Sequence, residues 1–245
     1  MAATVETSVE AFDVASATTL ESASISLAGA DRRLLVGVLS ADAGTPVDPS
    51  AVRWKGSGGT TLTKDTSVGG SVSANGSLSF WQLVAPATGS GTIHVTWGSN
   101  QLVRALIAVA VQDANQSSYT AHNATGTNTT PSDSVTTTAG DLVIDFAAFI
   151  RLAGGSATIS PTAGQTSIQE IEGGDLDAGG GGVGGLASSS KSASGASTTM
   201  SWTISATPDN WRTILVAIPA VGGGGSVIGA GLLHSLTLQP RSLVG

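Results

Sequence analysis

The clearest pattern of hydrophobic and polar positions lies between Thr198 and Pro219. Met200, Trp202 and Ile204 alternate with serine and threonine, which is the period of a strand that buries one face. The run from Trp211 to Ile218 is apolar at nearly every position, as in a central strand covered on both faces. A Pro-Asp-Asn segment between the two runs favours a turn. The pattern therefore predicts an antiparallel hairpin that closes the folded body, with Trp202 in its core.

Further strand-like runs recur at intervals of about 8 to 15 residues, separated by Gly, Pro and Asn. They are residues 4–14, 22–27, 33–40, 52–55, 60–64, 77–84, 92–97, 102–111, 135–138, 141–150 and 164–171. The apolar run at 102–111 fits a helix or a strand, and its valine and isoleucine content favours a strand. The spacing predicts an all-β fold, a two-sheet antiparallel β-sandwich of jelly-roll type.

Three segments carry no strand pattern. Residues 117–130 are polar and are expected to form an exposed loop, with the strand at 164–171 near a sheet edge. Residues 173–185 are mostly glycine, which indicates a mobile loop or a close-packed coil. The serine-rich segment 187–197 is expected to lead into the closing hairpin.

The composition changes after Pro219. We expect residues 1–219 to form the β-sandwich domain and residues 220–245 to form a glycine linker and a C-terminal apolar arm. The segment 226–245 is too short to hold a core of its own. It either folds back over its own sandwich or, as we favour, docks on a neighbouring subunit or shell as an added strand or extended arm. Its candidate assembly residues are Val227, Ile228, Leu232, Leu233, Leu236, Leu238, Leu243 and Val244.

Charge and cysteine content narrow the classes of function. The net charge is −7 and no lysine–arginine cluster occurs, which argues against direct nucleic-acid binding. The absence of cysteine excludes disulfides and thiolate metal sites. The first residues lack the pattern of a signal peptide, and no apolar run has the length of a membrane span. We therefore expect a protein made in the cytoplasm that does not insert into membranes.

Known catalytic and cofactor motifs are missing from the sequence. His94, His122 and His234 are far apart and lack convergent partners, no serine lies in a G-x-S-x-G motif, and no phosphate-binding loop occurs. The glycines that match G-x-G-x-x-G lie in a polyglycine tract, where the match has no meaning. We expect no catalytic residues, no cofactor and no metal, and hence no enzyme.

Two groups of residues leave a binding role open. Glu170, Glu172, Asp175 and Asp177 beside the glycine tract supply oxygen ligands of the kind that calcium prefers, but a solvated acidic loop is the favoured interpretation. Tryptophans bind sugars by stacking when they are exposed. Trp97 and Trp202 are on the inward phase of their strands, whereas the sequence does not place Trp54 and Trp81 as clearly. The fifth tryptophan of the chain is Trp211.

Three segments resemble a family of Gly/Ser/Thr-rich β-sandwich domains found in tailed-bacteriophage virion proteins, of decoration and fibre type, and in some bacterial surface proteins. They are the aromatic strand and turn FWQLVAPATGSGTIHVTW at 80–97, the strand start AGDLVID at 139–145, and the closing segment at 199–219. The resemblance covers about residues 30–219, implies the β-sandwich fold, and brings no catalytic residues.

The resemblance and the arm together favour a non-enzymatic virion structural protein, a capsid decoration or head-fibre protein. Its expected partners are other virion proteins, either the major capsid protein or neighbouring copies, so that it is a homo-oligomer on the particle. The alternative is a carbohydrate-binding or adhesion module on a phage tail or bacterial surface, with a host-surface glycan as partner. A hydrolase is the least favoured interpretation.

Overall fold

The computed structural model describes residues 1–42, 44, 46–73, 75–151, 156–162, 164–172 and 183–221. The described elements are all β-strands, and every strand pair is antiparallel. The predicted all-β, antiparallel, jelly-roll type of fold is confirmed. Within the described residues, no helix is long and apolar enough to cross a membrane.

The first half of the chain forms a five-stranded sheet, a four-stranded sheet and a small two-stranded sheet. The five-stranded sheet has the order β1 (Thr4–Asp13), β11 (Val103–Gln112), β4 (Arg33–Ala41), β8 (Gly76–Val84) and β7 (Thr63–Ser73). The four-stranded sheet has the order β2 (Ala17–Glu21), β10 (Ile93–Gln101), β5 (Ala51–Trp54) and β6 (Thr60–Thr61). The small sheet pairs β3 (Ile25–Leu27) with β9 (Gly89–Gly91).

The second half of the chain forms a five-stranded and a three-stranded sheet. The five-stranded sheet has the order β12 (Thr120–Gly126), β19 (Asn210–Ile218), β14 (Leu142–Arg151), β17 (Val183–Ser192) and β16 (Thr166–Ile171). The three-stranded sheet has the order β13 (Ser132–Thr136), β18 (Ser197–Ile204) and β15 (Ile159–Pro161).

The two halves share one strand order. The two five-stranded sheets correspond strand by strand. The order in the first half is β1, β11, β4, β8 and β7, and the matching order in the second half is β12, β19, β14, β17 and β16. In the smaller sheets, β2, β10 and β5 correspond to β13, β18 and β15. The first strand of each half lies beside its last, and the second lies beside the next-to-last, which is the strand order of a jelly roll. The two-sheet sandwich expected once from the sequence therefore occurs twice, in tandem.

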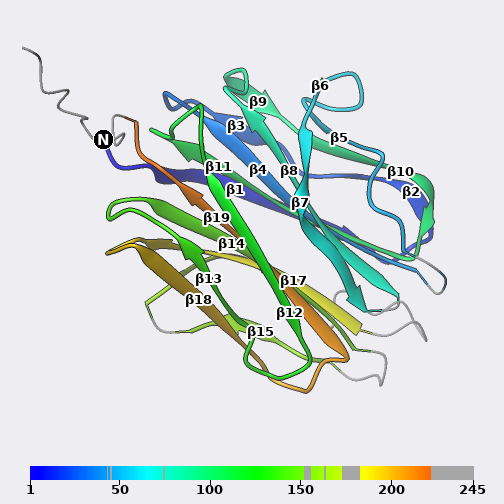
Figure 1. Ribbon diagram of the computed structural model, residues 1–245. Helices are drawn as coiled ribbons and strands as arrows, with labels where there is room; N and C mark the ends of the chain where they lie inside the picture. The colour runs from blue at the N-terminus through cyan, green and yellow to red at the C-terminus, as the bar shows by residue number, and fades with distance from the viewer. Residues whose placement is uncertain are drawn as a thin grey trace, which may run out of the picture.

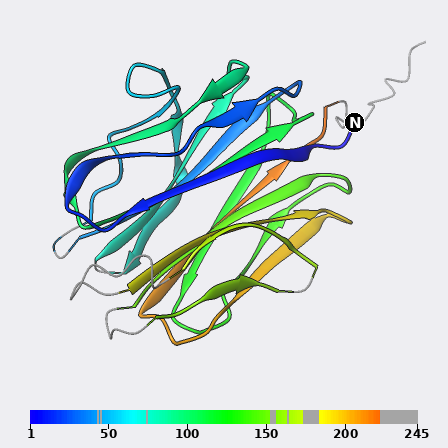
Figure 2. The same ribbon diagram turned by 180° about the vertical axis from the view of Figure 1, so that it is seen from behind.

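The two jelly rolls pack back to back through their five-stranded sheets, so that the body has four layers (Figures 1 and 2). The largest hydrophobic core lies between these sheets and includes Leu35, Leu39, Phe80, Ile107, Ile144, Phe146, Ile214 and Val216. Separate cores fill the interior of the first jelly roll and of the second. Because a continuous apolar layer joins the two jelly rolls, they form one folded body rather than two independent domains joined by a linker.

The packing of the halves is approximately two-fold symmetric. β1 lies against β16, and β7 lies against β12. Since β1 corresponds to β12 and β7 to β16, exchanging the halves converts one contact into the other. Polar contacts support both sides: Gln169 Nε2 donates to Ser8 Oγ (3.0 Å), and Arg212 Nε donates to the Ser71 carbonyl (3.0 Å). The interface therefore resembles that of a symmetric dimer joined into one chain.

Near the middle of this interface, Gly37 of β4 meets Phe146 of β14. A Cβ atom added to Gly37 would lie 2.5 Å from Phe146 Cδ1, closer than van der Waals contact permits. The Phe146 side chain is fully buried, and its ring centroid lies 5.9 Å from that of Phe80 in the first jelly roll. Glycine at position 37 thus permits the two sheets to approach around one aromatic ring.

Four predictions about individual segments are wrong. The glycine-rich segment 173–185 is predicted as a loop or coil, but residues 183–185 begin strand β17, and residues 173–182 lie outside the described residues. The runs 198–204 and 211–218 are strands β18 and β19, but they do not pair as a hairpin, because β18 belongs to the outer sheet and β19 to the inner one. The polar segment predicted as a loop at 117–130 contains the edge strand β12, which pairs with β19. The segment 187–197 begins within β17, which pairs with both β14 and β16.

Candidate functional site

The predicted assembly arm, residues 226–245, lies outside the described residues, as do Asp175, Asp177 and His234. The last described residue is Val221, whose backbone N–H donates to the Asp113 carbonyl (3.0 Å), while Ala220 forms a β-bridge with Ala114. The chain is thus held to the segment that joins the two jelly rolls immediately before the glycine linker begins.

All five tryptophans lie in the interior. Trp54, Trp81, Trp97, Trp202 and Trp211 are each at most 5% exposed. The prediction that Trp97 and Trp202 pack in the core is confirmed, and Trp54 and Trp81 are core residues too. No tryptophan presents a face to solvent on which a sugar ring could stack.

One buried carboxyl group organises the interior of the second jelly roll. Asp145 of β14 is fully buried, and its Oδ1 accepts hydrogen bonds from the Ser189 backbone N–H (2.9 Å) and hydroxyl (2.7 Å) of β17. Its Oδ2 accepts from Trp202 Nε1 (2.7 Å) of β18. The group therefore ties the inner sheet to the outer one. Burial raises the pKa of Asp145 to about 7 from its ordinary 3.8, although the donated hydrogen bonds favour the charged form.

The raised pKa of Asp145 predicts a pH-dependent stability. Its contribution is fully present below about pH 4 and is lost as the pH rises through about 7, because the folded protein holds a proton that the unfolded chain releases. Asp145→Asn removes this ionisation, so its free energy of unfolding should fall less between about pH 5 and about pH 8 than that of the wild type. Urea unfolding at both pH values measures the difference.

The control for this prediction is Asp31→Asn, because Asp31 is exposed and its φ of 44° is one that asparagine also adopts. The control should follow the wild-type pH dependence. Equal pH dependence of the Asp145 variant and the wild type would contradict the prediction.

A polar cluster holds the segment that joins the two jelly rolls. Arg33 of β4 donates from Nε to the Asn115 carbonyl (2.6 Å), and its guanidinium lies 5.3 Å from the centre of the Tyr119 ring. The Tyr119 hydroxyl donates to the Asp65 carboxylate of β7. Burial and Asp65 together raise the pKa of Tyr119 to about 12. These contacts fasten the start of the second jelly roll to the first.

The two described histidines each lie beside an acid and do not converge. His122 Nδ1 lies 2.8 Å from Asp133 Oδ1 and joins β12 to β13, while His94 Nδ1 lies 3.5 Å from Glu21 Oε2. Glu170 of β16 accepts a hydrogen bond from the Ser167 hydroxyl (2.6 Å). Among the described residues, no three His, Asp or Glu side chains are grouped so that they could hold a metal ion.

The outer face of the sheet β13–β18–β15 is lined by hydroxyl groups. Its strands bury Met200, Trp202 and Ile204 and direct the alternate positions outward. The outward residues are Ser132, Ser134, Thr136, Ser160, Ser197, Thr199, Ser201 and Thr203. This face therefore offers an uncharged surface of groups that both donate and accept hydrogen bonds.

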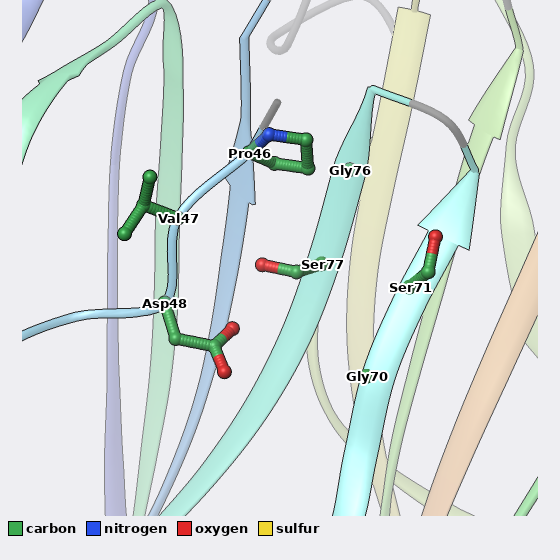
Figure 3. A pocket seen from close by; sticks show the side chains of 7 residues that line it. All are labelled: Pro46, Val47, Asp48, Gly70, Ser71, Gly76 and Ser77. Carbon is green, nitrogen blue, oxygen red and sulfur yellow. The ribbon is translucent and has the colours of Figure 1, made fainter. Parts of the chain in front are cut away.

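A pocket of about 370 Å³ opens at one end of the first jelly roll. It lies between residues 46–48, which precede β5, and the end of the β7–β8 hairpin, where Gly70, Ser71, Gly76 and Ser77 line it (Figure 3). The sequence singled out neither the carboxylate nor the two hydroxyl groups of this lining, because the segments that form the pocket are distant along the chain. Asp145, by contrast, had a signal: it is one acid inside an otherwise apolar strand.

Comparisons with known proteins yield little. No family model matches the chain, and no curated protein matches it. One solved structure, described as "The Triple Jelly Roll Fold and Turret Assembly in an Archaeal Virus", is similar with a TM-score of 0.26 and 11% sequence identity. The match covers 83% of this chain and 56% of that one, so this chain spans little more than half of its length. A TM-score this low supports no inference about fold or function.

Proposed function

We propose that the chain is a non-enzymatic structural protein of a tailed-bacteriophage virion, a capsid decoration or head-fibre protein. The observation that carries the proposal is the pair of jelly rolls fused through one continuous core. Jelly rolls recur in viral capsid domains and in lectins, and a fold alone does not set a function. The resemblance of residues 80–97, 139–145 and 199–219 to phage virion domains favours the first of these two uses.

The doubled body suits a particle protein for a physical reason. The two five-stranded sheets pack against each other and are covered. Both outer sheets and the sheet edges therefore stay available for contacts with other molecules (Figure 1). The hydroxyl-lined face of β13–β18–β15 carries no charged side chain at its outward positions, so a partner meets no desolvation penalty from buried ions there. Its proposed partners are the major capsid protein or neighbouring copies.

Purified virions test this proposal. Mass spectrometry should detect the chain in the particle, and cryo-electron microscopy should show density for two back-to-back jelly rolls in a fixed number of copies per capsomer. A chain that is expressed during infection but missing from washed particles would refute the virion role.

The C-terminal arm is the proposed anchor, and its removal gives a separate prediction. Deleting residues 222–245 should leave the body folded, because every core described above lies before residue 222, but should abolish joining to particles. The reason is that the arm carries many apolar side chains, each worth about 1.5–3 kcal/mol when fully buried.

The measurement is occupancy on particles after mixing with virions that lack the protein. A second variant keeps the arm length and replaces four leucines by serine, so it separates the loss of apolar side chains from the shortening of the chain. The four leucines are Leu232, Leu233, Leu236 and Leu238. Both variants should melt like the full chain and fail to bind. Normal occupancy of the truncated protein would show that the anchor lies elsewhere on the body.

A carbohydrate-binding module is the second candidate. The burial of every tryptophan counts against a module that binds sugar by ring stacking. A glycan would have to be bound through hydrogen bonds instead.

A further inference from the structure

We propose that the pocket between residues 46–48 and the β7–β8 hairpin binds a neutral polyhydroxyl ligand of the size of one sugar residue. This is a binding activity beyond the structural role proposed above, and it stands on the side chains of Asp48 and Ser77. At about 370 Å³ the pocket lies near the lower end of the range for small-molecule sites, which is about 300–1,000 Å³.

Two polar atoms in the pocket lining have no hydrogen-bond partner among the described residues. They are Ser77 Oγ and Asp48 Oδ1. Ser77 is 8% exposed, and Figure 3 shows its side chain directed from β8 toward residues 46–48, with the Asp48 carboxylate directed back toward β8. A group seated between these two segments is placed to give both atoms a partner.

Retaining such a pair costs stability. A buried hydroxyl without a partner forfeits the hydrogen bonds it made to water, so an alanine of similar size would suit the free protein better. The neighbouring buried serines of the same sheet do have partners: Ser79 Oγ accepts from Trp81 Nε1 (3.1 Å), and Ser40 Oγ accepts from Trp97 Nε1 (2.7 Å). Ser77 differs from them in facing a pocket.

The charges around the pocket select the class of ligand. Lys64 Nζ lies 2.6 Å from Asp48 Oδ2, so the carboxylate is already neutralised by an ammonium group. The ion pair has no net charge that would attract a further ion. Arg212, another cation beside the lining, is already engaged because it donates to the Ser71 carbonyl and to Asn123 Oδ1. Calcium prefers six to eight oxygen ligands, and the pocket lining offers a single carboxylate.

A neutral ligand with adjacent hydroxyl groups meets these requirements. One hydroxyl donates to Asp48 Oδ1, and the next exchanges a hydrogen bond with Ser77 Oγ, which both donates and accepts. Pro46 supplies apolar surface for the carbon face of a sugar ring (Figure 3). The geometry therefore points to a sugar bound by hydrogen bonds at the rim of the first jelly roll.

The test is a titration of the full chain, labelled with nitrogen-15, with glucose, galactose, mannose and N-acetylglucosamine at millimolar concentrations. At least one sugar should shift the backbone amide signals of Gly70, Gly76 and Ser77 in a saturable way. Ser77→Ala and Asp48→Asn should each weaken that binding by at least about five-fold, the effect of about one hydrogen bond. Ser77→Ala should also raise the melting temperature of the free protein.

The control is Ser90→Ala, which removes an exposed hydroxyl from β9, at the far end of the same jelly roll (Figure 1). It should bind like the wild type and melt at the same temperature. The proposal is overturned if no sugar shifts these signals, which would indicate an ordered water only, or if Ser77→Ala binds as tightly as the wild type. Equal binding of spermidine or phosphate would overturn the assignment to neutral ligands.

Discussion

Replacing Trp202 by alanine is expected to lower the free energy of unfolding by about 3–5 kcal/mol, the usual cost of removing a large aromatic side chain from a core. Trp202 is fully buried between the two sheets of the second jelly roll. The change also leaves Asp145 Oδ2 without the donor that now lies 2.7 Å away. A cavity and an unpaired buried polar atom therefore arise together.

Trp202→Phe separates these two contributions. Phenylalanine keeps much of the apolar volume and loses the N–H group, so it should cost less than alanine, about 1–3 kcal/mol for a buried acceptor left unpaired. Denaturant unfolding of both variants at one pH gives the comparison. A loss below about 1 kcal/mol for the alanine variant would be incompatible with a buried Trp202.

Phe146→Ala is expected to be comparably severe, about 3–5 kcal/mol, because Phe146 fills the layer between the two jelly rolls. Gly37→Ala should also destabilise, by about 1–3 kcal/mol, because its methyl group would meet the Phe146 ring. In the double variant the methyl group enters the space that the ring has left. The double variant should thus lose less stability than the sum of the two single changes.

A double-mutant cycle from urea unfolding measures this coupling. The matched control pairs Phe146→Ala with Ser90→Ala, which lies on the surface far from the interface, and should be additive. Additivity of the Gly37 and Phe146 changes would mean that the two residues do not meet and that the jelly rolls pack differently. A lower slope of the unfolding transition would show that the halves unfold separately.

The periodicity of single strands could be predicted from the sequence. Met200, Trp202 and Ile204 are buried while the residues between them face outward, as the alternation indicated. The doubly apolar runs at 33–40 and 102–111 are central strands of an inner sheet. These predictions hold because successive side chains of a strand point to opposite faces of the sheet. Burial of one face therefore produces an alternation of apolar and polar residues in the sequence.

Strand pairing could not be predicted in the same way. β18 and β19 are adjacent in sequence and joined by a turn, yet they pair with different neighbours, because the chain crosses between two sheets at that turn. A turn signal shows that the chain reverses direction and does not show which strand edges meet. The assignment of partners depends on contacts that are distant in sequence.

Local composition misled where small residues pack closely. The Gly- and Ser-rich strand β17 lies between β14 and β16 because its lack of bulk permits close approach: a Cβ on Gly185 would lie 2.2 Å from the Phe149 ring. Ser189, polar by composition, is fully buried because Asp145 accepts its hydrogen bonds. Strand propensity thus gave way to tertiary context, as it often does in sheets.

The sequence by itself determined that the chain is an antiparallel all-β protein, which strand faces are buried, and that Trp202 lies in the core. The tertiary structure alone decided that the strands form two jelly rolls, that these pack through Phe146 and Gly37, and that Asp48 and Ser77 share a pocket. The physical reason is how far apart in sequence the interacting residues lie. Alternation and turns depend on neighbouring residues, whereas sheet partners, layers and pockets arise from contacts between segments many residues apart.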